Sequence, residues 1–148
     1  MVIKQKPTAP DYHGAILYSL GFGLLAALLW FAVVVVTGWQ FGIVAIGVGA
    51  ACGYGVYLGS KKHTGMNLQL MAAGFSLIAI LVGEYLITNH FTYQYITHEL
   101  GEQTMYFLHF WPIVQETFYF VVAEPLTLLF WAIAIYTGFA IPRDKDTE

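Results

Sequence analysis

Hydrophobic residues in this chain occur in long blocks rather than in short alternating patterns. Four blocks are mainly apolar, and polar residues gather between them; the blocks are 16–36, 41–58, 66–88 and 113–141. A helix that crosses a membrane needs about 20 mainly apolar residues at a rise of 1.5 Å per residue. The pattern therefore predicts an all-α membrane protein, with residues 1–148 forming a single bundle of four transmembrane helices.

The segments between the blocks predict how the helices are connected. Residues 37–40 form a turn so short that the first two helices should be antiparallel neighbours. Residues 89–111 instead mix aromatic and polar side chains, a composition typical of an element that lies in the membrane interface. We expect a short interfacial helical element there, on the outer face between the third and fourth helices.

The last block allows two interpretations, because it contains both Pro112 and Pro125. Proline is best tolerated in the first turn of a helix. A helix that starts near Pro112 must tilt or kink at Pro125, whereas one that starts at Pro125 is close to the lower length limit for crossing. We favour the kinked helix over 113–141, because the residues before Pro125 are nearly as apolar as those after it.

The cationic residues lie in three short clusters, which predict the orientation of the bundle. The clusters are Lys4 with Lys6, Lys61 with Lys62, and Arg143 with Lys145. The segments between the clusters contain no cationic residue other than histidine. Cytoplasmic loops retain Lys and Arg, so all three clusters should face the cytoplasm. The sequence thus predicts an integral protein of a prokaryotic inner (plasma) membrane with both termini in the cytoplasm.

Composition excludes several classes of protein. The chain is 58% hydrophobic and 10% charged, far from the values of a soluble domain. The single cysteine, Cys52, excludes an intramolecular disulfide, and no basic stripe exists that would bind nucleic acid. No histidine pair lies deep enough for haem b, and no GxSxG, HExxH or phosphate-binding glycine loop is present. The chain is therefore expected not to be an enzyme.

Small residues recur along the second block at helical spacing. One set follows a spacing of four residues: Gly47, Ala51, Gly55 and Gly59. Gly49 and Gly53 form a second set with the same spacing. Small residues at this spacing let helix backbones approach closely in lipid. We expect this helix to be central and to pack against the first and third helices or a partner subunit, with a glycine-lined conduction path as the alternative.

Two glutamates are candidates for an ion or proton site. Glu84 lies in an apolar stretch about one turn before the outer end of the third block, where a carboxylate should be protonated, paired or facing a wet cavity. Glu84 could also be a ligand to a metal. The structural alternatives are a hydrogen bond to Tyr or Ser on a neighbouring helix, or an interfacial acid that reaches the outer water. Glu124 precedes Pro125, and it is either a helix cap or a second acid near the depth of Glu84.

The outer element also contains possible metal ligands. His98 and Glu102 are four residues apart and would share one face of a helix, and His90 and His109 belong to the same segment. Imidazole and carboxylate are suitable ligands for zinc, copper or iron. Polar decoration of an interfacial helix is the simpler explanation, because the spacing matches no strong metal motif.

Several segments support a resemblance to known proteins. They comprise the run Gly47 to Lys62, Gln69 to Ala72, the pair Glu84-Tyr85, and the terminal Leu129 to Gly138 with Ile141 to Arg143. With these segments the chain resembles small bacterial four-span integral membrane proteins of unassigned function. The resemblance implies the four-span fold and brings no catalytic residue.

Three functions follow as hypotheses. The first is a non-catalytic membrane subunit that packs against, assembles or stabilises a larger complex, with membrane lipids and other membrane subunits as partners. The second is a small proton or cation transporter, or a channel-like protein, that uses Glu84. The third is an outer-face metal-binding protein.

Overall fold

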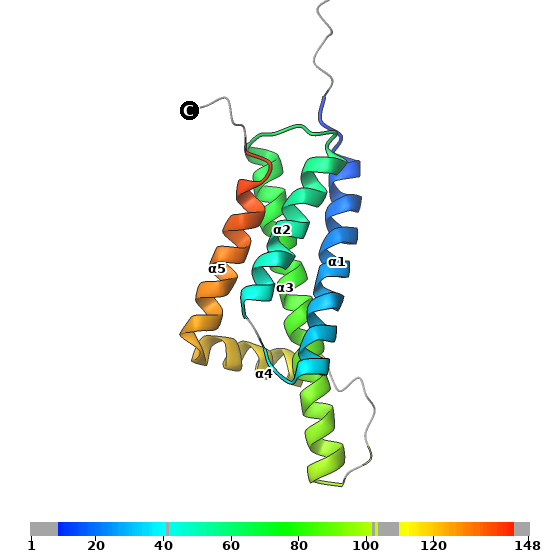
Figure 1. Cartoon of the computed structure of the whole chain (residues 1–148), viewed down its shortest axis with the longest axis vertical. Helices are drawn as coiled ribbons and strands as arrows, with labels where there is room; N and C mark the ends of the chain where they lie inside the picture. The colour runs from blue at the N-terminus through cyan, green and yellow to red at the C-terminus, as the bar shows by residue number, and fades with distance from the viewer. Residues whose placement is uncertain (1–8, 41, 102, 104–109, 144–148) are drawn as a thin grey trace, which may run out of the picture.

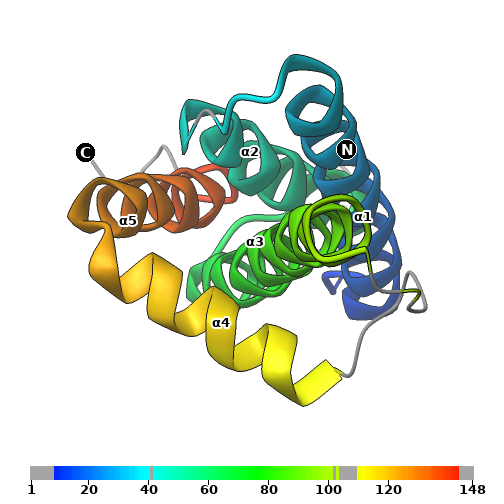
Figure 2. The same cartoon turned by 90° about the horizontal axis from the view of Figure 1, so that it is seen from below.

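The computed structural model describes residues 9–40, 42–101, 103 and 110–143, and these residues form helices and no strand. Four helices run along the long axis of the molecule and pack as a bundle (Figure 1). They are α1 (Tyr12–Thr37), α2 (Gly42–Gly59), α3 (Met66–Gln94) and α5 (Pro125–Ala140). A further helix, α4 (Phe110–Ala123), lies across one end of the bundle (Figures 1 and 2). The all-α fold expected from the sequence is confirmed.

Helices α1, α2 and α3 are each long and apolar enough to cross a membrane. The α4–α5 pair would be a fourth span only if the two helices count together, because they meet at an angle of 98°. The favoured single kinked helix over 113–141 is thus replaced by two helices, with α5 starting at Pro125 as in the alternative. Proline lacks an N–H and forces the preceding residue out of the helical region, and Glu124 is extended, with φ −111° and ψ 95°.

Helix α3 is longer than the hydrophobic pattern indicated. It continues through residues 89–94 into one π-helical turn, Tyr95–Glu99, before Gly101 reverses the backbone with φ 68°. The expected separate interfacial element over 89–111 is therefore corrected: its first half extends α3, and the helix across the bundle end starts only at Phe110. No proline or glycine occurs in residues 84–100, so nothing in the sequence ends the helix there. The polar residues after 88 change the hydropathy of the helix and do not end it.

The α1–α2 turn depends on a glycine. Gly38 caps α1 in the left-handed region, with φ 67°, and its N–H donates to the carbonyl oxygen of Val34 at 2.8 Å. Glycine adopts this conformation without steric cost. The turn lies at the same end of the bundle as α4 (Figure 1).

The opposite end of the bundle gathers the start of α1, the α2–α3 connection and the end of α5 (Figure 1). Lys61 lies 3.6 Å from the Asp11 carboxylate, and the N–H of Gly65 donates to the carbonyl oxygen of Pro142 at 3.1 Å. The cationic residues that the structure describes, Lys61, Lys62 and Arg143, therefore share one end. Lys4, Lys6 and Lys145 lie outside the described residues.

Glycines let the backbone of α2 pack closely against two neighbouring helices. A Cβ at Gly55 would come within 2.7 Å of the Tyr18 carbonyl oxygen of α1, and one at Gly59 would overlap the backbone of Gly14. On the other side, Gly49 faces Ala134 and Gly53 faces Gly138, both in α5. The α2 glycines thus face α1 and α5, whereas Gly47 faces open space and Ala51 is half-buried.

Candidate cation site

Glu84 is held at the point where α3 passes the α1–α2 turn and the start of α5. The residue is only 2% exposed, although it lies in an apolar helix. Its carboxylate accepts a hydrogen bond of 2.7 Å from the Gln40 amide and a longer one of 3.4 Å from the Trp131 indole N–H. The first bond is the strong one, since hydrogen bonds weaken with distance and charged acceptors favour short contacts.

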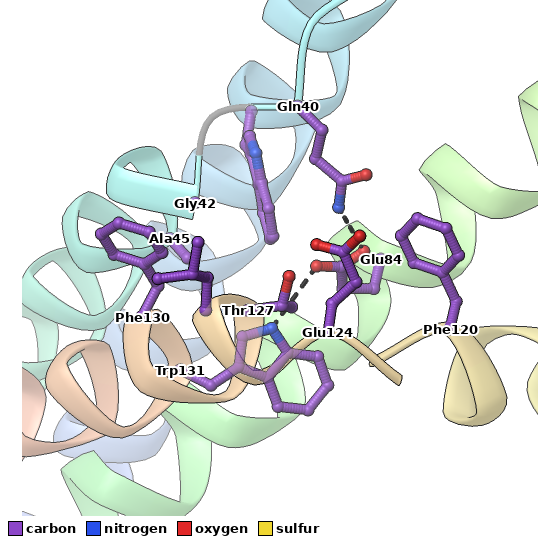
Figure 3. Close-up of a pocket in the computed structure, with 11 residues that line it drawn as sticks. Gln40, Gly42, Ala45, Glu84, Phe120, Glu124, Thr127, Phe130 and Trp131 are labelled. Carbon is purple, nitrogen blue, oxygen red and sulfur yellow. Dashed lines mark hydrogen bonds between the residues drawn. The ribbon is translucent and has the colours of Figure 1, made fainter. Parts of the chain in front are cut away.

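A cavity of about 230 Å³ opens beside this carboxylate. Residues of α1, α2, α3, α4, α5 and the α1–α2 turn line it, and Figure 3 shows their arrangement: Trp30, Gln40, Gly42, Ala45, Glu84, Phe120, Glu124, Leu126, Thr127, Phe130 and Trp131. The walls therefore combine two carboxylates, an amide and a hydroxyl with four aromatic rings.

Glu124 supplies the second carboxylate from the break between α4 and α5. It occupies the N-cap position of α5, but its side chain makes no hydrogen bond to the first-turn amides. The carboxylate instead points into the cavity, as that of Glu84 does (Figure 3). Glu124 therefore stands at the start of α5, as the capping alternative expected, and also forms part of the cavity wall.

No basic side chain balances the two acids. Lys and Arg are missing from the described residues that line the cavity, and the sequence contains none between Lys62 and Arg143. Two carboxylates at one cavity raise the local negative potential and attract a proton or another cation. The aromatic faces around them add a further attraction for a cation.

Trp30 adds a buried polar group to this region. The residue is 1% exposed, and its indole N–H has no hydrogen-bond acceptor within the part of the chain that the structure describes. The six-membered ring packs against α3, where a Cβ at Gly83 would come within 2.7 Å of it. A buried N–H without an acceptor is unfavourable, so close packing on Gly83 holds the ring in place at a cost.

Of the predicted metal ligands, the structure describes His90 and His98. His90 is half-buried in α3, where its ring contacts Phe31 and Phe91 edge to face, and His98 is exposed in the π-helical turn. Among the described residues no three His, Cys, Asp or Glu side chains come together as metal ligands. Glu102 and His109 lie outside the described residues, so the full set of four is not seen together.

No protein-family model, curated protein or solved structure matches this chain. The functional residues must therefore be inferred from the chemistry of the cavity.

Sequence reasoning identified both acids but missed the residues that surround them. Gln40 was seen only as part of a turn, and Trp131 and Trp30 only as apolar residues of their helices. Gln40 is 44 positions and Trp131 47 positions from Glu84, so no local spacing links them. The unbalanced glutamates were the one available signal.

Proposed function

We propose that this chain is a small membrane protein that binds a proton or a small cation at the Glu84–Glu124 cavity and moves it across the membrane. The observation that carries the proposal is the burial of Glu84, 2% exposed, beside a cavity with a second carboxylate and no basic side chain among its described lining residues. Ionisable groups inside a membrane are costly, and they mark ion or proton pathways.

The break between α4 and α5 supports the same proposal. Non-helical backbone at membrane depth is tolerated where it lines a cavity, and interrupted helices in transporters place their broken ends at ion sites. Glu124 is the single extended residue between the two helices, and it lines the cavity.

The contact between α2 and α5 favours a carrier over an open pore. Past the cavity, Gly49 faces the backbone of Ala134, and Gly53 faces that of Gly138. Two backbones in contact leave no room for a hydrated path. Passage to the other end therefore requires α2 and α5 to separate, as in a rocking motion of α5.

The test is a flux measurement on the purified chain in lipid vesicles with an internal pH dye or a cation-sensitive dye. Glu84→Gln should lower the flux at least about tenfold, and Glu124→Gln should lower it less, because Glu124 is the more exposed acid. Glu116→Gln is the matched control, since Glu116 is exposed on α4 and does not line the cavity. Wild-type vesicles without flux, or equal flux from Glu84→Gln, would exclude the proposal.

A membrane subunit is the second candidate, and an apolar groove that shares Trp131 with the Glu84 cavity favours it. This groove of about 620 Å³ runs between α3, α4 and α5, with Leu81, Val114, Phe118 and Leu128 in its walls. A transmembrane helix of a partner would fill such a groove. Val114→Trp should then release a partner that co-purifies in mild detergent, whereas Leu25→Trp on the exposed face of α1 should not. A chain that purifies alone with full flux would exclude this function.

A further inference from the structure

A second polar cleft lies at the end of the bundle away from Glu84. There α3 starts and α5 ends side by side, joined by the hydrogen bond from the Gly65 N–H to the Pro142 carbonyl (Figure 1). The cleft has a volume of about 280 Å³, and its walls include Met66, Gln69, Tyr136, Phe139 and Arg143. It shares no lining residue with the Glu84 cavity.

The start of α3 and the side chain of Gln69 bring hydrogen-bonding groups to this end of the cleft. Helix α3 starts at Gly65 with no side-chain cap, so the first-turn N–H groups after Gly65 have no acceptor within the described chain. Gln69 is 7% exposed and lines the cleft, and its side-chain amide bonds to no residue that the structure describes. A ligand in the cleft is within reach of this amide, which can both donate and accept a hydrogen bond.

The charges at the cleft are positive. Arg143 brings a guanidinium to the cleft, and the start of α3 brings the positive end of a 29-residue helix. No Asp or Glu is among the described residues that line it. The complementary ligand is an anion with several acceptor oxygens, for which a phosphate group is the best match to guanidinium and helix amides.

We infer that this cleft binds the phosphate group of an anionic membrane phospholipid. Met66 and Tyr136 are 62% and 64% exposed beside the polar groups, so an apolar surface on which acyl chains can lie continues from the headgroup position. Lys61 and Lys62 stand in the preceding connection at the same end and add to the attraction for anionic lipid. The inference does not depend on the Glu84 site.

The test uses the full-length protein in detergent micelles, with bound lipid counted by native mass spectrometry. Phosphatidylglycerol should be retained over phosphatidylcholine, and Arg143→Gln should weaken its binding about tenfold, as expected for loss of a charge-assisted hydrogen bond. Gln69→Leu, which keeps the side-chain size, should also weaken it. Lys62→Gln removes the same charge at the same end from a residue that does not line the cleft, so it is the control and should weaken binding less than Arg143→Gln. Circular dichroism melting confirms that each variant is folded.

Three results would overturn the inference. Equal retention of the two lipids would exclude a preference for an anionic lipid, because both carry the phosphate group. A loss from Lys62→Gln equal to that from Arg143→Gln would show that only the surface charge matters. Inorganic phosphate that binds in an Arg143-dependent way, without any retained phosphatidylglycerol, would show a site for a soluble anion and not for a lipid.

Discussion

The side-chain amide of Gln40 donates a 2.7 Å hydrogen bond to the Glu84 carboxylate, although 44 positions separate the two residues. The bond ties the turn between α1 and α2 to helix α3. It also holds one carboxylate oxygen of Glu84, while the Trp131 indole N–H contacts the other at 3.4 Å. Gln40 is thus the residue that positions the acid of the candidate site.

Replacing Gln40 should therefore destabilise the fold and disturb the site. Gln40→Leu leaves Glu84 with the long contact to Trp131 alone, and we expect it to lower the free energy of unfolding by about 1–3 kcal/mol. Thermal unfolding in detergent measures this change. Gln115→Leu, at an exposed position of α4, is the control and should leave the unfolding temperature unchanged. Equal effects of the two substitutions would contradict the assigned role of the Gln40 bond.

The α2–α5 contact predicts opposite results for two neighbouring glycines. A Cβ at Gly49 would overlap the carbonyl oxygen of Ala134, and backbone cannot move aside as a flexible side chain does. Gly49→Ala should cost about 1–3 kcal/mol or more of stability, through overpacking. Gly47→Ala meets open space and should change stability by less than about 1 kcal/mol. Denaturation in detergent compares the two variants. A Gly49→Ala variant as stable as the wild type would contradict the close contact between α2 and α5.

The N-terminal cap of α1 predicts a small dependence on pH. The Gly14 N–H donates to the Asp11 carboxylate at 2.9 Å, and this bond, aided by nearby Lys61, holds the pKa of Asp11 below its ordinary value. The stabilisation is present above the ordinary pKa of an aspartic acid and is lost as the pH falls through the lowered value. The Asp11 carboxyl carbon shift in NMR titration should report this lowered midpoint.

Asp11→Asn serves as the control for that titration. Asparagine keeps an oxygen that can accept from Gly14 but carries no titrating group. The difference in melting temperature between this variant and the wild type should shrink in acid. A midpoint at or above the ordinary aspartate value would contradict the cap.

Cysteine labelling tests the orientation that the cationic clusters predict. Cys52 is fully buried and should not react with a membrane-impermeant maleimide, so it gives no background. Gln103→Cys should be labelled in intact cells, and Thr64→Cys only after permeabilisation, because the two positions are exposed beyond opposite ends of α3. The reverse pattern would invert the topology.

Local signals in the sequence predicted much of the helical framework. The apolar blocks located α1, α2 and the start of α3 to within about one turn. The ends of the first two helices were recognisable because Gly38 follows α1 and Gly59 is the last residue of α2. They could not locate the end of α3, because hydropathy changes at residue 89 while nothing in the backbone stops the helix before Gly101. Pro125 indicated a kink, but the size of the bend depends on what α4 packs against.

The sequence by itself determined an apolar, all-helical chain with small residues on its second helix and acids that no nearby Lys or Arg balances. These properties follow from composition and local spacing, which act within a few residues. Only the tertiary structure decided that Gln40, Glu84 and Glu124 line one cavity and that the glycines of α2 face α5. Such contacts join residues far apart in the chain, which local spacing does not specify. The 98° bend between α4 and α5, with Glu124 between the two helices, is likewise a property of the folded chain.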